Sequence, residues 1–444
     1  MKRDLEENLL AWKDQRNRKP LILRGARQVG KSFLVEHILK NQFSSFVKVD
    51  FEQTREAQDC FNTLIPEKII ARLEVLSGKK IIPGETLLFL DEIQVCPQAI
   101  MALRYFKEQM PALHVIAAGS LLEFALSGSE FSMPVGRVEY LFLKPLSFTE
   151  FLTATGHDLL RERLAAVTLS EPPDEVLHRK ALDCVREYMI LGGMPAVVKE
   201  YNASKSWLGS QHEQAAILNT YRDDFGKYSR QSQQKCLNNL FDKAPGIIGE
   251  IFQYSKVDPH TDPRQIRMVI EKLTHAGLIY PAHAVSATGL PLLLTKNEKK
   301  FKLYFLDIGL VHRAMHLDLE LLLQEDLMLL YRGALAEQFV AQELLAYSDR
   351  HEPRQLCYWM REKTGSSAEV DFVIQAGTKI LPIEVKAGTT GRLRSLHLFM
   401  EEKKCPLAIR ISQHPLNLQD GVLSVPLYLI REIPDLIVNA SQKP

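Results

Sequence analysis

The stretch Gly25-Ala26-Arg27-Gln28-Val29-Gly30-Lys31-Ser32 fits the pattern G-x-x-x-x-G-K-[ST] in full. Before it, Leu21–Leu23 is typical of a short buried strand, and the apolar residues after it recur at helical spacing. A strand, a glycine-rich loop and a helix form the context in which this pattern cradles phosphates. The glycines let backbone N–H groups face a phosphate, Lys31 would add a charge at the β- and γ-phosphates, and the Ser32 hydroxyl would bind Mg²⁺. The alternative is a glycine turn before an ordinary helix.

An acid pair follows a second apolar run, Thr86–Leu90, which predicts a strand buried on both faces of a parallel sheet. The pair is Asp91-Glu92, and an acid at the carboxyl edge of such a sheet points into the ligand crevice. Asp91 would hold Mg²⁺ through water, and Glu92 would orient and deprotonate the attacking water. The alternative is that the pair caps a helix.

The first 150 residues alternate apolar strands with helical segments, which predicts a parallel α/β sheet covered on both faces. The expected strands are Leu21–Leu23, Phe46–Phe51, Thr86–Leu90, His114–Ala118 and Val138–Leu143.

Two polar residues near the last strands are further candidates. Ser120 follows the strand ending at Ala118, where its hydroxyl would sense the γ-phosphate or cap the next helix. Arg137 precedes the last strand; an arginine from a neighbouring subunit often stabilises transition-state charge in oligomeric ATPases. A surface ion pair is the alternative for Arg137.

Composition limits the class of protein. A chain of 444 residues is too long for one core, and its 46% hydrophobic and 25% charged residues are ordinary for a globular protein. The net charge of +1 gives no global sign of a nucleic-acid partner. No apolar run reaches 18 residues, and the first residues lack the apolar core of a signal peptide. The six scattered cysteines contain no C-x-x-C pair, so we expect reduced thiols in a cytoplasmic protein with no membrane partner.

The middle of the chain, from about residue 148 to 300, has a helical pattern. Pro263–Leu273 predicts an amphipathic helix that begins at a proline and ends before Gly277, and Leu278–Tyr280 and Leu290–Leu294 predict two short strands. This order is typical of a winged helix. Its basic residues, Arg264, Arg267 and Lys272, would contact nucleic-acid phosphates, or would form a solvated face or a protein contact.

A second candidate site lies near the C-terminal end. Glu369–Ile374 and Ile380–Lys386 predict a hairpin with Gly377-Thr378 in a type II′ turn, and this register places Asp371 opposite Glu384. Lys386 shares their face. Pro382 in mid-strand indicates an edge strand or a bulge.

Two facing carboxylates repel, so a divalent cation between them is expected. Asp371 and Glu384 would hold Mg²⁺, and the metal and Lys386 would activate water for phosphodiester hydrolysis. Glu337, on the apolar stripe of the expected helix Gly333–Tyr347, is a candidate third ligand. Residues 354–410 carry ten Lys/Arg against six Asp/Glu, which is compatible with phosphate contact. The alternative is a surface salt-bridge cluster.

Over nearly its whole length the sequence resembles the large prokaryotic family of predicted AAA-superfamily ATPases with a C-terminal domain of unknown function. The resemblance rests on these segments: Leu23–Ser32, Phe89–Gln94, Gly119-Ser120, Gly136–Val138, Leu143–Phe148, Leu191–Pro195, Glu369–Asp371 and Ile383–Lys386. It implies a P-loop AAA-type ATPase domain (residues 1–150), a helical and winged-helix region (151–300) and a restriction-endonuclease-like α/β domain (301–444). In that nuclease fold an acid is followed by acid–x–lysine on the next strand, which Asp371, Glu384 and Lys386 match, with Glu337 as the helix acid.

Two functions are compatible with these observations. The first is an ATP- and Mg²⁺-dependent ATPase, compatible with a homo-oligomer, that is coupled to a nuclease-like domain that binds DNA or RNA. The second is a regulatory switch in which ATP drives oligomerisation and the C-terminal fold only binds DNA or protein. Metal-dependent cleavage of a nucleic acid distinguishes them.

Overall fold

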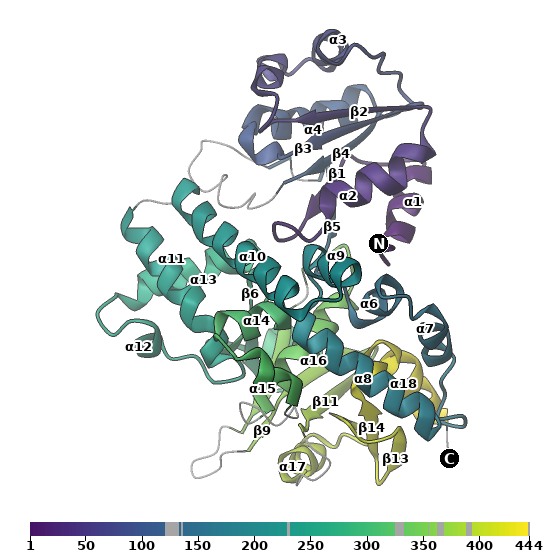
Figure 1. Ribbon diagram of the computed structural model, residues 1–444, viewed down its shortest axis with the longest axis vertical. Coiled ribbons are helices and arrows are strands. Elements are labelled where there is room, and N and C mark those ends of the chain that lie inside the picture. Colours follow the sequence, from purple (N-terminus) through teal and green to yellow (C-terminus); the bar gives the residue numbers. More distant parts are fainter. Residues whose placement is uncertain are drawn as a thin grey trace.

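The computed structural model describes residues 1–119, 133–134, 136–228, 231–324, 333–353, 355–361, 368–387 and 393–442. Figure 1 shows an N-terminal sheet with its helices at one end, a group of helices beside and below it, and the C-terminal strands at the other end. One continuous cluster of buried apolar side chains extends from Leu5 to Ile437, so the parts pack against one another through a shared core.

The N-terminal part is built on a five-stranded parallel sheet in the order β2-β3-β4-β1-β5. Its elements are α1 (Glu6–Asp14), β1 (Leu21–Arg24), α2 (Lys31–Leu34), a π-helical turn η1 (Val35–Leu39), η2 (Lys40–Gln42), β2 (Ser45–Asp50), η3 (Arg55–Phe61), α3 (Pro66–Ser77), β3 (Thr86–Asp91), η4 (Ile93–Val95), α4 (Pro97–Gln109), β4 (His114–Ala118) and β5 (Glu139–Phe142). The five predicted strands and their parallel arrangement are confirmed.

The central strands β3, β4 and β1 are buried on both faces, as their continuous apolar sequences predict. Alternate residues of each strand point to opposite faces. Leu21 and Leu23 join the cluster that contains α1 and α2, whereas Ile22 joins the cluster that contains α3 and α4. The carboxyl ends of β1 and β3 therefore meet at one edge, where the glycine-rich loop and the acid pair lie.

The middle part is helical, as predicted, and ends in a helix followed by two antiparallel strands. Its elements are α6 (Phe148–Ala154), α7 (Asp158–Ala165), α8 (Glu175–Leu191), α9 (Pro195–Ser204), α10 (Trp207–Tyr228), α11 (Gln231–Lys243), η5 (Ala244–Ile247), α12 (Tyr254–Val257), α13 (Pro263–His275), β6 (Ile279–Val285), η6 (Leu292–Thr295) and β7 (Lys296–Phe305). Helix α13 begins at a proline and is followed by Gly277 with φ +72°, as the sequence predicts.

The prediction of a strand at Leu290–Leu294 is wrong. Leu292–Thr295 forms a 3₁₀ turn, closed by a hydrogen bond from the Thr295 hydroxyl to the Leu292 carbonyl (2.8 Å). The partner of β6 is instead the lysine-rich segment Lys296–Phe305. The alternation of buried and exposed residues in this segment cannot be recognised in the sequence, because Lys302 is buried (1% exposed) among apolar residues. Strand β7 crosses the predicted boundary at residue 300.

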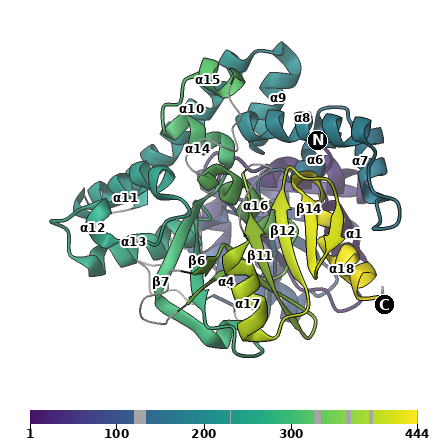
Figure 2. The same ribbon diagram turned by 90° about the horizontal axis from the view of Figure 1, so that it is seen from below.

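The C-terminal part has one sheet of its own and shares a second sheet with the middle part, and helix α16 contacts both. The elements of this part are α14 (Ile308–Ala314), α15 (Leu319–Gln324), α16 (Ala334–Ala346), β8 (Leu356–Met360), β9 (Glu369–Val370), β10 (Phe372–Ala376), β11 (Lys379–Val385), α17 (Arg394–Lys403), β12 (Ala408–Ser412), β13 (Asn417–Gln419), β14 (Val422–Pro426), η8 (Leu427–Glu432) and α18 (Ile433–Gln442). One sheet has the order β7-β6-β8-β9 and the other β10-β11-β12-β14-β13. Figure 2 shows β11, β12 and β14 side by side.

The predicted hairpin register is confirmed. Phe372 pairs with Ile383 and Ala376 with Lys379, around a turn in which Gly377 has φ +59°. The suggestion from Pro382 that β11 is an edge strand is wrong, because β11 lies between β10 and the parallel strand β12. The proline is tolerated there because pairing with β12 begins at Ile383, so the missing N–H breaks no hydrogen bond to β12.

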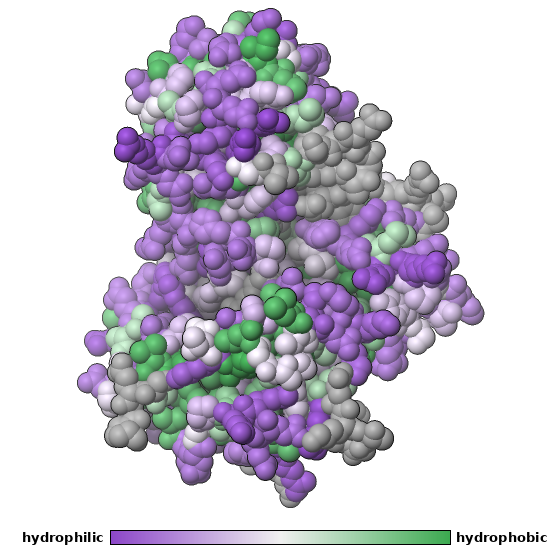
Figure 3. Space-filling model, turned by 180° about the vertical axis from the view of Figure 1, so that it is seen from behind, coloured by the Kyte–Doolittle hydropathy of each residue, from purple (hydrophilic) through white to green (hydrophobic). Residues whose placement is uncertain are grey.

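The surface is hydrophilic over most of the N-terminal part, and hydrophobic residues gather over the C-terminal part in the view of Figure 3. No helix among the described residues combines the length and apolar composition needed to cross a bilayer.

Candidate functional site

Three residues of the glycine-rich loop have a backbone conformation that favours glycine. Gly25 (φ +145°), Gln28 (φ +67°) and Gly30 (φ +99°) lie in the left-handed region. A side chain on Gly25 would place its Cβ 2.2 Å from the Leu143 carbonyl oxygen, so this position requires glycine. The loop joins β1 to α2, which begins at Lys31. Strand, loop and helix therefore follow one another as the sequence predicts.

Lys31 is folded over its own loop. Its ammonium group donates hydrogen bonds to the carbonyl oxygens of Gly25 (2.9 Å) and Ala26 (2.8 Å), and the residue is 7% exposed. Burial lowers the pKa of Lys31 to about 8, although the nearby carboxylates of Glu92 and Asp91 oppose this shift. The loop thus holds a cation at its centre, within the field of the acid pair.

Ser32 and Asp91 lie side by side, as a shared metal requires. The Ser32 hydroxyl donates to Asp91 Oδ1 (3.0 Å), and Lys48 Nζ is 3.1 Å from Asp91 Oδ2. Burial raises the pKa of Asp91, while Lys48 and Ser32 lower it. A hydroxyl and a carboxylate are hard oxygen donors of the kind that Mg²⁺ prefers, so these residues fit that ion. The sequence analysis missed Lys48, a single cation in the strand Ser45–Asp50.

Glu92 follows β3 in a left-handed conformation (φ +49°), which turns its side chain away from the strand direction. Its Oε2 accepts a hydrogen bond from the Gln94 amide (2.6 Å), and its charge acts on both Lys31 and Arg27. The side chain makes no capping hydrogen bond to the short helix η4 that follows it. The arrangement places a carboxylate beside the phosphate loop and leaves the helix-cap alternative without support for Glu92.

Helix α10 contacts the phosphate loop at Arg27. Arg27 Nη1 donates to both carboxylate oxygens of Asp224 (2.7 Å each), and the Tyr221 hydroxyl donates to the Arg27 carbonyl (2.7 Å). Arg27 Nη2 is also 3.8 Å from Glu52. The sequence analysis named Arg27 only as part of the loop; its ion pair with a residue 197 positions later has no local sequence signal.

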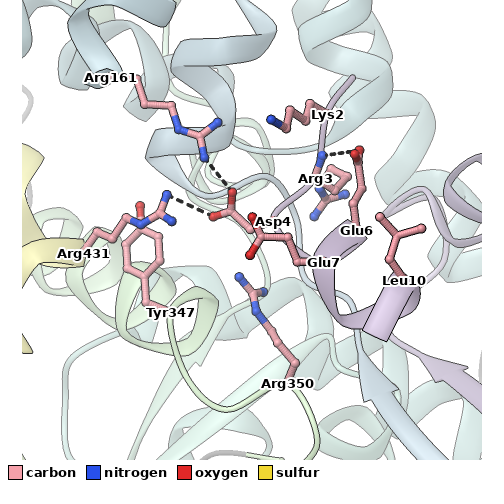
Figure 4. A pocket seen from close by; sticks show the side chains of 10 residues that line it. All are labelled: Lys2, Arg3, Asp4, Glu6, Glu7, Leu10, Arg161, Tyr347, Arg350 and Arg431. Carbon is pink, nitrogen blue, oxygen red and sulfur yellow. Dashed lines mark hydrogen bonds and ion pairs between the residues drawn. The ribbon is translucent and has the colours of Figure 1, made fainter. Parts of the chain in front are cut away.

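The N-terminal segment is a second anchor of the loop. Arg3 (4% exposed) donates to the carbonyl oxygens of Val29 (2.9 Å) and Lys144 (2.6 Å), and it forms an ion pair with Glu150 (3.1 Å). Arg3 also lines a polar cavity of about 560 Å³, shown in Figure 4.

In that cavity the carboxylate of Asp4 bridges Arg161 (2.9 Å) and Arg431 (3.3 Å). These two arginines belong to the middle and C-terminal parts, respectively. The N-terminal segment therefore ties all three parts of the chain together at one place.

The other two candidates of this region are Ser120 and Arg137. Ser120 lies outside the described residues. Arg137 precedes β5, and since β5 runs parallel to β1, it lies at the sheet edge opposite the loop. Arg137 is 47% exposed and forms an ion pair with Glu108 (2.9 Å). Its contribution to a neighbouring subunit stays a prediction.

The C-terminal candidates come together around the start of β10. Asp371 lies one residue before the Phe372–Ile383 pair, and its Oδ2 accepts a hydrogen bond from the Val385 N–H (2.7 Å). Lys386 Nζ is 2.6 Å from Glu384 Oε1. Glu384 is 6% exposed, and its Oε2 is buried with no hydrogen-bond partner among the described residues.

Glu337 of α16 completes the cluster together with residues that the sequence analysis missed. Lys302 Nζ is 3.4 Å from Glu337 Oε2 and 2.5 Å from Glu369 Oε1. The Tyr304 hydroxyl donates to Glu337 Oε2 (3.0 Å). Lys302 could have been noticed in the sequence, because a charged residue inside an apolar strand needs a partner.

Burial and mutual repulsion raise the pKa values of these acids. Burial and the Asp371 charge raise the pKa of Glu337 to about 8 and that of Glu384 to about 7. Burial also raises the pKa of Asp371. Burial opposes the charge on Lys302, but the carboxylates of Glu337, Asp371 and Glu369 raise its pKa overall. The raised pKa values mean that negative charge on these acids is unfavourable unless a cation lies beside them.

The donor chemistry of this cluster fits a divalent cation, since the carboxylates are oxygen ligands and Glu384 Oε2 has no hydrogen-bond partner in the part of the chain that the structure describes. Within the described residues, however, no group of three or more His, Cys, Asp or Glu side chains is arranged to hold a metal ion. Lys302 supplies part of the positive charge that a metal would otherwise provide.

The basic residues of α13 are only partly available. Arg264 and Arg267 are exposed, and Arg267 forms an ion pair with Glu271 (3.3 Å) on the same helix. Lys272 packs toward α11, where its ammonium donates to the Gln233 side chain (2.8 Å). The exposed basic face thus contains two of the three predicted residues.

Comparison with protein families identifies the N-terminal part. Residues 17–152 match a family model described as an AAA domain. Residues 182–321 and 332–430 match two domains of unknown function, DUF8612 and DUF4143. The chain therefore carries a AAA ATPase domain followed by two domains of unknown function. A search of curated proteins found no match.

Several solved structures show a distant likeness. The Orc1 protein of Aeropyrum pernix, solved in complex with DNA, is 14% identical over 71% of this chain and 90% of that chain, with a TM-score of 0.30. PCH-2 of C. elegans is 11% identical over 46% of this chain and 63% of that chain, with a TM-score of 0.27. Protein VC1899 of Vibrio cholerae is 13% identical over 95% and 97%, with a TM-score of 0.21. These scores are too low to support a shared overall fold.

Proposed function

We propose that this protein is a Mg²⁺-dependent ATPase of the AAA superfamily, coupled to a nuclease-like C-terminal domain that binds nucleic acid. The observation that carries the ATPase proposal is the convergence of Lys31, the Ser32–Asp91 pair and Glu92 at one edge of the parallel sheet. Each group then has a place in phosphoryl transfer.

The loop amides and Lys31 bind the β- and γ-phosphates of ATP. Ser32 and Asp91 would hold Mg²⁺, which neutralises phosphate charge when it is bound. Glu92 orients a water molecule whose oxygen forms a bond to the γ-phosphorus as the bond to the β,γ-bridging oxygen breaks. The water proton passes to Glu92, and the products are ADP and inorganic phosphate. In a homo-oligomer, Arg137 of one subunit contributes positive charge to the site of the next.

The C-terminal proposal rests on Asp371, Glu384 and Lys386, which the confirmed hairpin register and the Lys386–Glu384 ion pair bring together, with Glu337 close by. Asp371, Glu384 and Glu337 would have to move closer together to hold a divalent cation, which would then polarise a phosphodiester. Lys386 stabilises the negative charge that develops on the phosphate. The exposed Arg264 and Arg267 of α13 supply contacts to the nucleic-acid backbone.

A second candidate function is favoured by Lys302. Its ion pairs with Glu337 and Glu369 already balance part of the negative charge of the cluster. In that case the C-terminal domain only binds DNA or a protein, and ATP drives a change of oligomeric state.

Incubation of the purified protein with DNA and RNA, with Mg²⁺ or Mn²⁺ and with or without ATP, distinguishes the two functions. The nuclease-like proposal predicts metal-dependent cleavage that Lys386→Ala abolishes, while the control Lys403→Ala, at a partly exposed lysine, leaves it unchanged. A crystal soaked in Mn²⁺ should then show anomalous density between Asp371 and Glu384. Absence of both cleavage and density would reduce the domain to a binding module.

A further inference from the structure

Arg27 is the third residue of the phosphate loop, and its side chain stays beside the loop rather than extending into solvent (23% exposed). Although burial lowers the pKa of Arg27, its hydrogen bond to Asp224 and the charges of Asp224, Glu92 and Glu52 raise it overall. Arg27 and Glu92 are both close enough to Lys31 for their charges to act on it. The guanidinium therefore belongs to the group of charges where the γ-phosphate and the attacking water would lie.

Asp224 fixes one edge of this guanidinium. Only Nη1 of Arg27 is used in the bonds to the two carboxylate oxygens, both 2.7 Å long. Asp224 is 1% exposed and lies on α10, a helix of 22 residues whose Tyr221 also binds the Arg27 carbonyl. A buried carboxylate on a long helix is a rigid holder for an arginine.

The other edge of the guanidinium remains usable. An arginine side chain has five N–H donors in a planar fork. Among the described residues, Nε makes no hydrogen bond and Nη2 makes only the 3.8 Å approach to Glu52. The free Nε and Nη2 edge has the geometry that binds two oxygens of a phosphate.

We infer that Arg27 is a catalytic residue that binds the γ-phosphoryl group of ATP within its own chain, and that Asp224 is the positioning residue that orients it. This inference rests on the proposed ATPase function. During the step given above, Arg27 binds the oxygens on which negative charge accumulates, and it transfers no proton. Because Asp224 belongs to α10, the middle part of the chain contributes directly to the reaction.

Binding measurements test this contact without requiring hydrolysis. In the wild-type protein, calorimetric titration with the non-hydrolysable analogue AMP-PNP should give tighter binding than titration with ADP. Arg27→Ala should reduce this preference by about tenfold or more, because only the triphosphate has the group that Arg27 binds. An unchanged preference would overturn the inference. A wild-type protein that does not hydrolyse ATP would instead overturn the proposed function, and the binding ratio would still decide the role of Arg27.

Kinetic measurements separate catalysis from folding. Arg27→Ala should lower kcat by roughly 10²- to 10³-fold and raise KM for ATP by about tenfold, in line with the weaker binding of the triphosphate. Arg27→Lys should restore only part of kcat because lysine lacks the planar fork. Asp224→Asn should lower kcat by about tenfold, since one of the two acceptor oxygens is lost. The matched control is Arg222→Ala on the same helix, which removes an ion pair with Asp242 of α11 (2.8 Å) and should leave kcat unchanged. Equal losses in the control variant and in Asp224→Asn would show only a structural role for α10.

A mixing experiment tests whether Arg27 acts in its own chain. A mixture of Arg27→Ala and Lys31→Ala proteins should show no recovery of hydrolysis, because no chain in it has both residues. Recovery would mean that Arg27 acts on a neighbouring subunit.

Discussion

At the scale of single residues, the phosphate loop is the part of the site most directly encoded in the sequence. Lys31 is central to the loop, since its ammonium group donates hydrogen bonds to two carbonyl oxygens of the loop. The same cation would bind the phosphates of ATP.

Lys31→Ala should therefore lose ATP binding, by roughly 100-fold or more, because a phosphate site without its cation keeps only backbone N–H donors. Calorimetric titration of ATP measures this. Lys40→Ala, which changes an exposed lysine nearby, should bind as the wild type does. Unchanged affinity in Lys31→Ala would contradict the assignment of the loop.

The contacts that could not be predicted from the sequence are those between residues that lie far apart along the chain. Arg27 meets Asp224, and Glu337 meets Lys302, only because the helices and strands that carry them pack together. The strand, loop and helix around the motif, the strand before the acid pair and the hairpin register depend on local spacing, and the structure has these elements as predicted. Leu290–Leu294 was predicted to be a strand because an apolar run favours a strand when its burial is unknown. The strand Lys296–Phe305 was not predicted because it contains several lysines, one of which is buried.

At the scale of elements, α16 links the C-terminal cluster to the junction of the three parts. It carries Glu337 at one end and Glu343 near the other. Both carboxylate oxygens of Glu343 accept from the Phe148 N–H (3.1 Å each), and the Tyr188 hydroxyl lies 3.3 Å from Oε1. Burial raises the pKa of Glu343 to about 7.

This shift predicts a pH dependence of stability. Because the pKa is higher in the folded than in the unfolded state, the folded protein binds more protons, so this contribution is present below pH 4.5 and is lost as the pH rises through 7. Glu343→Gln, which keeps one acceptor oxygen, should remove that part of the slope, up to ~3 kcal/mol between pH 4.5 and 8. Denaturant unfolding across this range measures it, with the exposed Glu67→Gln as control. An unchanged slope in Glu343→Gln would show that the carboxyl is not protonated in the folded protein.

At the scale of the whole molecule, the continuous core and the anchors Arg3 and Asp4 join the ATPase domain to both later parts. Nucleotide binding at the loop is thus placed to affect the helical part through Asp224. The parallel sheet could be predicted because its strands are continuous apolar runs. The contacts between parts could not, since they depend on packing between segments more than 100 residues apart.

Assembly is tested by Arg137. Arg137→Ala should bind ATP but be nearly inactive if a neighbouring subunit needs this arginine, and mixing it with Lys31→Ala should restore some hydrolysis, because one interface then pairs an intact arginine with an intact loop. Steady-state hydrolysis of the mixture measures this. No recovery in a mixture shown to co-assemble would leave Arg137 with its surface ion pair to Glu108.

The central claim is that Glu92 activates water for ATP hydrolysis at a Mg²⁺-dependent P-loop site. The most direct measurement is the steady-state rate of ATP hydrolysis of the wild type and of Glu92→Gln, with the exposed Glu85→Gln as control. The predicted result is Mg²⁺-dependent turnover in the wild type and in the control, and a rate about 10²- to 10⁴-fold lower in Glu92→Gln, with ATP affinity retained. A wild type without turnover, or a Glu92→Gln protein that hydrolyses ATP at the wild-type rate, would contradict the claim.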